Sequence, residues 1–195
     1  MTAWIAAIEP KRVRVATDGI TTNVYSGEQG TVSRPKARLV PMHDGVTTGY
    51  GVIWLADLFA WTLNLHGDAE PFEETVERTH QELKQHAINW HRKVAANGGK
   101  PTEVTQVAAG WSERQQQFVA YLWRSWPDER VELQELRYGL WLSPFLGMDY
   151  PQAVVDDAID WLPMLAAQRQ EMESEGRYIV GGEACLYEVR RGEAH

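Results

Sequence analysis

Hydrophobic and polar positions near the start of the chain follow the pattern of a β-hairpin. The segment WIAAI (4–8) is mostly apolar, as expected of a strand that is buried on both faces, and VRVAT (13–17) alternates. Between them, Pro10 in the segment EPKR suits the second position of a tight turn. The two strands are therefore predicted to pair around a turn at Pro10 and Lys11.

The period then changes, and two helices are predicted. Residues 52–66 are apolar on nearly all sides, which is typical of a buried helix. Residues 71–97 have an amphipathic pattern, with Pro71 near the start and Gly98–Gly99 at the end. Further strands are predicted over 36–40, 45–51, 104–111, 116–124, 131–142 and 177–191, and a further helical stretch over 150–173. This order of strands and helices indicates an α+β fold with two sheets and two helical layers.

Composition is that of a soluble globular protein and argues against several functions. The 195 residues suit a single domain over 1–195, with 44% hydrophobic and 24% charged residues. The formal net charge of −8 does not favour binding to nucleic acid or to an anionic membrane. Cys185 is the only cysteine, so a reduced, cytoplasmic setting is expected. The most apolar segment, VIWLADLFAWTLNL (52–65), contains Asp57 and is short for a membrane span.

Thr2 directly follows Met1, and the predicted hairpin brings an acidic residue close to it. With the turn centred as above, Asp18 lies opposite residue 3, give or take one position. Lys36 opens the next predicted strand and can approach the same strand end. A carboxylate and a cation are therefore predicted beside Thr2.

A threonine at a free N-terminus carries its own base. The hydroxyl needs activation, and the α-amino group, with an ordinary pKa of about 7.7–8.0, is partly neutral at physiological pH. The base is attached to the nucleophile itself, so no second segment has to bring it there. A nearby Lys36 cation would lower the pKa of that amine and stabilise an oxyanion, and Asp18 would keep the cation charged and in place. Removal of Met1 would therefore make Thr2 a candidate nucleophile.

These positions and their order resemble a known family of peptidases. Thr2, Asp18, Thr22, Lys36 and the segment TGYGVIWLAD (48–57) are similar to the β-type subunits of the proteasome and to their bacterial relative HslV. The resemblance covers nearly the whole chain in order and length. It implies the four-layer αββα sandwich of the N-terminal-nucleophile (Ntn) hydrolases, a mature chain that begins with a catalytic threonine, and hydrolysis of peptide bonds.

The resemblance also implies roles for further residues. The main-chain N–H of Gly49 corresponds to an oxyanion donor of the family. Ser143, in the segment GLWLSPFLG (139–147), corresponds to a serine that the family has between two glycines, although those glycines are missing here. The implied catalytic set is Thr2, Asp18, Lys36, Gly49 and Ser143.

Several positions depart from the family pattern. Arg177 and Val180 stand where the family has an aspartate and a serine or threonine before a Gly-Gly pair, and arginine can only donate hydrogen bonds. Either the register is shifted there, or the supporting residues have been rebuilt, or the site is weak or inactive. Lys36 comes two residues later than the usual spacing, and Arg34 is the less favoured substitute for it.

Two functions of different class follow from these observations. The first is a threonine-type endopeptidase within a self-compartmentalised ring, which cleaves peptides or unfolded proteins. The alternative is a catalytically silent, ring-forming structural subunit. The family's α-type subunits carry an additional N-terminal helix that is absent from this sequence, which favours the first function. Arg177 and Val180 favour the alternative.

The resemblance implies an assembly and a protein partner, but no cofactor. A double-ring homo-oligomer is expected, with the helices at 52–66 and 71–97 in the contacts between subunits. An AAA+ unfoldase is a candidate partner. His80, His86 and His91 lack the spacing of metal ligands and are predicted to lie on a solvated helix face.

Overall fold

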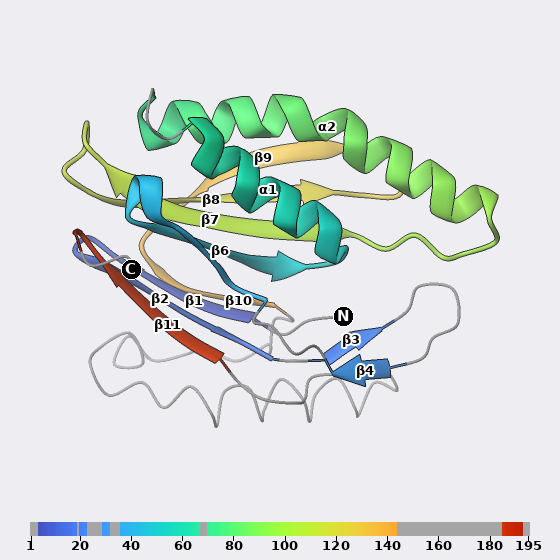
Figure 1. Cartoon of the computed structure of the whole chain (residues 1–195), viewed down its shortest axis with the longest axis horizontal. Helices are drawn as coiled ribbons and strands as arrows, with labels where there is room; N and C mark the ends of the chain where they lie inside the picture. Colours follow the sequence, from blue (N-terminus) through green and yellow to red (C-terminus); the bar gives the residue numbers. More distant parts are fainter. Residues whose placement is uncertain are drawn as a thin grey trace.

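The computed structural model arranges the chain as two stacked antiparallel β-sheets, with two helices on the outer face of one sheet (Figure 1). The structure describes residues 4–18, 20–22, 29–31, 36–66, 70–143 and 185–192. This arrangement confirms the α+β fold class with its two sheets. The helical stretch predicted over 150–173 lies outside the described residues, so three of the four predicted layers are described.

The first sheet has four strands in the order β10-β1-β2-β11. These strands are β1 (Trp4–Glu9), β2 (Arg12–Thr17), β10 (Gly139–Ser143) and β11 (Cys185–Arg190). β1 and β2 form the N-terminal hairpin, in which Trp4 lies opposite Thr17. The turn falls on Pro10 and Lys11, so the predicted pairing register is confirmed.

β1 is buried on both faces, as its apolar pattern predicts. Trp4, Ala6 and Ile8 belong to the core between the sheets, and Ile5 and Ala7 alternate with them on the opposite face. None of the five is more than 3% exposed. The hairpin that leads into the candidate site is therefore a central, well-packed support.

The second sheet has five strands in the order β5-β6-β7-β8-β9, and α1 and α2 cover it (Figure 1). Its strands are β5 (Arg38–Val40), β6 (Gly45–Tyr50), β7 (Val104–Ser112), β8 (Gln117–Ser125) and β9 (Val131–Leu136). The other elements are a short 3-10 helix (Pro41–His43), α1 (Ile53–His66), α2 (Phe72–Ala96) and a separate pair of short strands, β3 (Ile20–Thr22) and β4 (Gln29–Thr31). Both predicted helices are confirmed to within one residue at each end.

Apolar side chains form two cores, one between the sheets and one between the second sheet and the helices. β8 contributes to both, because successive residues of a strand point to opposite faces. Phe118 lies in the core between the sheets, and Trp123 lies in the core beneath the helices, where its ring packs against Phe59 of α1. Phe118 and Trp123 are fully buried. The second sheet is thus fixed against both of its neighbouring layers.

The single strand predicted over 131–142 is wrong. The chain forms β9 in the second sheet and then β10 in the first. Gly139, the first residue of β10, has a φ of 133°, which a residue with a side chain rarely adopts. The adjacent Tyr138 donates a hydrogen bond to the main-chain oxygen of Phe118 at 3.3 Å. The glycine therefore lets the chain leave one sheet and enter the other.

Helix α1 is not buried all round, contrary to the prediction from its sequence. Its inner side packs into the core, where Phe59 is fully buried. Its outer side leaves four large apolar side chains 40–59% exposed: Ile53, Trp54, Trp61 and Leu65. An exposed apolar face of this kind is typical of a surface that contacts another molecule. Within the described ranges, no helix has the length and apolarity that are needed to cross a membrane.

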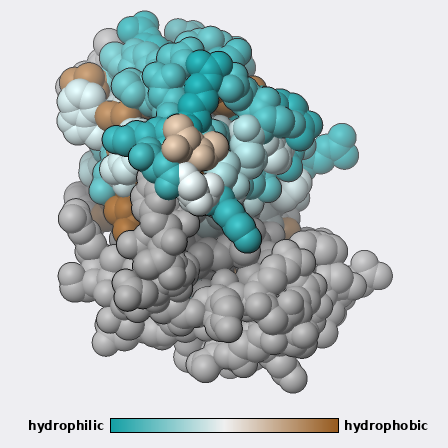
Figure 2. All heavy atoms as spheres, turned by 90° about the vertical axis from the view of Figure 1, so that its right-hand side faces the viewer, coloured by the Kyte–Doolittle hydropathy of each residue, from teal (hydrophilic) through white to brown (hydrophobic). Residues whose placement is uncertain are grey.

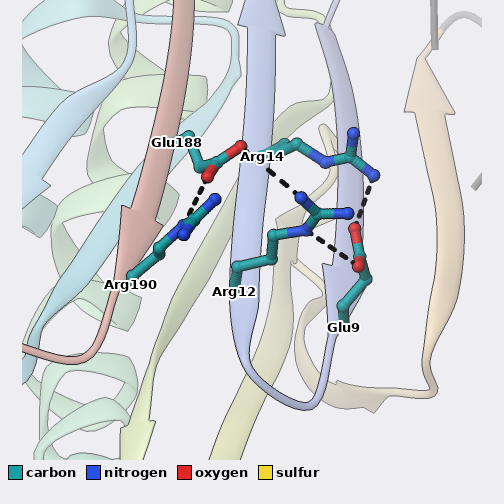
Figure 3. A network of polar contacts seen from close by, with 5 residues as sticks. All are labelled: Glu9, Arg12, Arg14, Glu188 and Arg190. Carbon is teal, nitrogen blue, oxygen red and sulfur yellow. Dashed lines mark hydrogen bonds and ion pairs between the residues drawn. The ribbon is translucent and has the colours of Figure 1, made fainter. Parts of the chain in front are cut away.

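Charged residues join three strands of the first sheet at the turn end of the hairpin (Figure 3). Glu9 of β1 accepts from Arg12 at 2.9 Å and from Arg14 at 2.5 Å, both on β2. On β11, Arg190 donates to Glu188 at 2.6 Å, and Glu188 lies 3.9 Å from Arg12. Arg14 is only 6% exposed, so a polar position of the alternating VRVAT pattern is buried here. These contacts connect β11 to the hairpin at the end away from Trp4 and Thr17.

Candidate active site

Asp18 and Lys36 are in direct contact, so the structure brings together a carboxylate that the hairpin register places and a lysine from a separate segment. Asp18 directly follows the last residue of β2 in the first sheet, and Lys36 lies two residues before β5 of the second sheet. The Nζ of Lys36 donates to Oδ1 of Asp18 at 2.8 Å. The two side chains are 8% and 3% exposed, so this is a buried ion pair. It joins segments that are eighteen residues apart in the sequence.

The surroundings of Lys36 alter its acid–base behaviour. Burial lowers the pKa of the Lys36 ammonium below its ordinary value, and the charge and hydrogen bond of Asp18 oppose that change. The pair therefore holds a positive charge in a place where water screens it poorly. A cation in such a place lowers the pKa of a neighbouring amine and stabilises a neighbouring oxyanion.

Gly49 lies at the same end of the second sheet. Arg38 of β5 is paired with Thr47 of β6, and the same register continued by two residues makes Gly49 level with Lys36. A Cβ atom at Gly49 would lie 1.9 Å from the main-chain oxygen of Thr105 on β7. The close approach of β6 and β7 is therefore sufficient to require glycine here. Donation from its N–H to an oxyanion stays a prediction.

Replacement of Gly49 by alanine is expected to destabilise the protein by about 3 kcal/mol, because the new methyl group would collide with main chain that cannot move aside cheaply. Urea denaturation measures this loss. Gly98→Ala is the control, since a Cβ there meets nothing within 4 Å and only the positive φ of 74° is unfavourable. That variant is expected to lose about 1 kcal/mol. Equal losses in the two variants would contradict the packing explanation.

The main chain of Ser143 also lies at this end of the first sheet. Ser143 is the last residue of β10 and is paired with Trp4, which is paired in turn with Thr17. Ser143, Trp4 and Thr17 are thus paired side by side on three neighbouring strands, and Asp18 is the next residue after Thr17. Its side chain is not described, so its predicted role stays a prediction.

Four other candidate-site residues fall outside the part of the chain that the structure describes: Thr2, Arg34, Arg177 and Val180. The prediction that the α2 histidines lie on a solvated face is wrong for His80 and His91, which are 9% and 1% exposed because they face the sheet side of the helix. Thr22 ends β3, where its main chain pairs with Gln29 of β4. Of the predicted set, the structure therefore brings Asp18 and Lys36 into direct contact.

The surface beside the end of α2 is polar. The last turns of α2 and the segment that leads into β7 lie furthest to the right in Figure 1, and that side faces the viewer in Figure 2. The described surface in this view is mainly hydrophilic, with a few scattered apolar residues (Figure 2).

Two residues next to the pair were not predicted from the sequence. Arg38, the first residue of β5, donates from Nε to Oδ1 of Asp57 at 2.6 Å and from Nη1 to the main-chain oxygen of Lys36 at 2.6 Å. The only local signal is an arginine within the otherwise apolar strand RLV, two residues after Lys36. For Asp57, the local signal is a single carboxylate within the most apolar segment of the chain.

Comparison with known proteins shows the fold. No protein-family pattern and no curated protein sequence matches the chain. A solved structure of Anbu (ancestral beta-subunit) from Yersinia bercovieri is similar with a TM-score of 0.58 and 12% identity, over 96% of this chain and 81% of that one. Anbu from Hyphomicrobium sp. strain MC1 is similar with a TM-score of 0.55 and 13% identity, over 97% and 82% of the two chains.

These likenesses define the class of fold and correct the family that the sequence suggested. The chain has a proteasome-like Ntn-hydrolase fold. The assignment to the proteasome β-type subunits and HslV is wrong, because these neighbours are Anbu proteins, a distinct proteasome-like family. At 12% and 13% identity the likeness concerns the fold alone.

Proposed function

We propose that the protein is a threonine-type endopeptidase of the Ntn-hydrolase class, with Thr2 as nucleophile after removal of Met1. The buried contact of 2.8 Å between Lys36 and Asp18 is the observation that carries this proposal. It lies at the strand end where β1 begins, two residues after Thr2 in the sequence. A buried charge pair contributes little net stability compared with an apolar pair, so its presence at this strand end favours a chemical role.

The proposed reaction splits peptide hydrolysis into two steps. The hydroxyl of Thr2 attacks the substrate carbonyl, and the free α-amine accepts the hydroxyl proton and returns it to the leaving amine. The C–N bond breaks, and a water molecule then hydrolyses the resulting ester to release the acid and regenerate the hydroxyl. Lys36 lowers the pKa of the α-amine and stabilises the oxyanion, Asp18 holds Lys36, and the N–H of Gly49 donates to the oxyanion.

Intact-mass spectrometry tests this proposal directly. The purified protein should lack Met1, since threonine is small enough for methionine aminopeptidase. Brief incubation with an unstructured peptide ester should then add the mass of the acyl group, and peptide mapping should locate it on Thr2. A chain that has lost Met1 but forms no such adduct would contradict the peptidase and favour the alternative.

The alternative is a ring-forming subunit without activity, and the outer face of α1 supports its structural part. Trp54 and Trp61 are seven residues apart on the helix, so they lie on the same side, and they are 44% and 59% exposed. Trp90 of α2, in contrast, packs against the core beneath the helices. Both proposals therefore share a homo-oligomer with α1 in the contact. A double ring, an AAA+ unfoldase partner and a cytoplasmic location belong to the same proposal.

Light scattering is expected to report a mass of roughly 260–310 kDa, which corresponds to two stacked rings of six or seven copies of the 22.2 kDa chain. Trp61→Glu is expected to shift the protein to small species, because a charge would have to be buried in the contact. Leu186→Glu on β11 is the matched control. Leu186 is also 59% exposed, but it belongs to the first sheet, whereas α1 covers the second. A monodisperse wild-type species near the mass of one or two chains would rule out the ring.

A further inference from the structure

Arg38 connects the candidate site to helix α1. Its guanidinium donates to the Asp57 carboxylate on α1 and to the main-chain oxygen of Lys36, with both distances at 2.6 Å. A guanidinium is planar and holds its donors in a fixed arrangement. The main chain of Lys36 is therefore placed relative to α1 through a single rigid group.

The β5–β6 ladder does not reach Lys36. The three residues of β5 pair with β6, and the first of them is Arg38. Lys36 lies two residues earlier, and the residue between them, Ala37, is 5% exposed in the core between the sheets. The hydrogen bond from Arg38 thus extends the ordered main chain beyond the strand to the residue that carries the buried ammonium.

We propose that Arg38 is a positioning residue, which holds Lys36 where its ammonium meets Asp18 and which is itself anchored by Asp57 of α1. Arg38 contacts the main chain of Lys36 and not the place where a substrate would react, so it is not a catalytic residue. Only the expected effect of Arg38 on peptide hydrolysis rests on the proposed function. The placement of Lys36 is a property of the fold and can be measured separately.

The exposure of the two ion pairs argues for a geometric role. The side chains of Arg38 and Asp57 are 17% and 43% exposed, and ion pairs at a partly exposed site add little to the free energy of unfolding. The pair that they support is buried, with Lys36 8% exposed. The main effect of Arg38 is therefore on the position of Lys36 and not on the stability of the whole protein.

The test measures the surroundings of Lys36 without relying on peptide hydrolysis. The chain has five lysines, and competitive labelling with trace acetic anhydride, followed by peptide mass mapping, gives the pKa of each amine in the full, assembled protein. The variants are Arg38→Met and Asp57→Leu. Arg92→Met is the matched control, because Arg92 pairs with Glu129 through two hydrogen bonds of 2.7 and 2.6 Å on the surface.

Asp57→Leu separates a positioning effect from a simple charge effect. Loss of the negative charge alone would lower the pKa of Lys36, since a nearby anion favours the ammonium. Release of Lys36 into water would raise that pKa, because burial is the largest cause of its lowered value. We expect the Lys36 pKa to rise in Asp57→Leu and in Arg38→Met, and to stay unchanged in Arg92→Met.

For the proposed hydrolysis, Arg38→Met is expected to lower kcat by about 100-fold with KM unchanged, which is the loss that a displacement of about 1 Å can cause. Arg38→Lys retains a single donor and should fall between this variant and the wild type. Arg92→Met should keep the wild-type kcat. A general loss of folding would instead lower the amount of active protein and leave the KM and the Lys36 pKa of the remaining fraction unchanged.

An unchanged or lowered Lys36 pKa in Asp57→Leu would overturn the inference. If Arg38→Met does not fold, Asp57→Leu decides alone, because it leaves Arg38 in place. If the wild-type protein hydrolyses no peptide while the Lys36 pKa rises in both variants, the proposed function fails and the positioning role stands. The two failures are therefore distinguishable.

Discussion

Replacement of Thr2 by alanine is expected to abolish the hydrolysis of unstructured peptides, with a loss in kcat of at least about 10³-fold. Alanine leaves the α-amine in place but removes the hydroxyl that would form the acyl-enzyme. The base therefore remains without a nucleophile. Hydrolysis of a fluorogenic peptide measures the loss, and intact mass shows that Met1 is still removed, since alanine is also small.

Two further variants make this measurement specific. Thr2→Ser keeps a hydroxyl at the N-terminus and should retain measurable hydrolysis. Thr102→Ala removes a hydroxyl from an exposed position between α2 and β7, and it should retain full activity. Full activity in Thr2→Ala would show that the nucleophile is elsewhere and that the mechanism is wrong.

Local chemistry determines the parts of the fold that the sequence predicts well. Pro10 is pre-set for a turn, and the turn in turn fixes every pair of the hairpin from Trp4 onward. α2 ends at Ala96, and Gly98 follows with a φ of 74°, which is the usual way for a glycine to end a helix. In both places a single residue type restricts the main chain, so the sequence alone is sufficient.

Choices between distant partners are not visible in the same way. The alternation over 131–142 suits a strand in either sheet, and Gly139 is the one residue that marks the crossing from β9 to β10. The apolar pattern of α1 does not tell whether its side chains are buried by the same chain or by another molecule. Phe59 is covered by the second sheet, whereas Trp61, two residues later, is 59% exposed.

The candidate site likewise has a part that the local sequence predicts and a part that depends on packing between distant segments. The hairpin register places Asp18 at the end of β2, next to the start of β1. Lys36 reaches Asp18 once the two sheets are stacked. The link from Arg38 to Asp57 spans nineteen residues and depends on how α1 packs on its sheet. No spacing rule connects a strand residue with a helix residue at that distance, so this part of the site appears only in the structure.

Replacement of Lys36 by methionine is expected to remove activity and to destabilise the protein. Activity is lost because nothing lowers the pKa of the α-amine or stabilises the oxyanion. Stability falls by about 3–5 kcal/mol because the Asp18 carboxylate, 3% exposed, stays buried without this cation. Arg34→Ala should have the smaller effect on activity. The reverse order of these two variants would show that the wrong cation was chosen.

A second substitution separates the chemical role of Lys36 from its structural one. Asp18→Asn in the Lys36→Met background removes the carboxylate charge and keeps a group of similar shape, so urea denaturation should give a stability within about 1 kcal/mol of the wild type. Activity should stay absent, because the restored packing brings back no cation. Recovery of hydrolysis together with stability would mean that Lys36 only supports the fold. Recovery of stability without hydrolysis would show that the ammonium of Lys36 takes part in the reaction, because the double variant would then be folded and would lack only the charge pair.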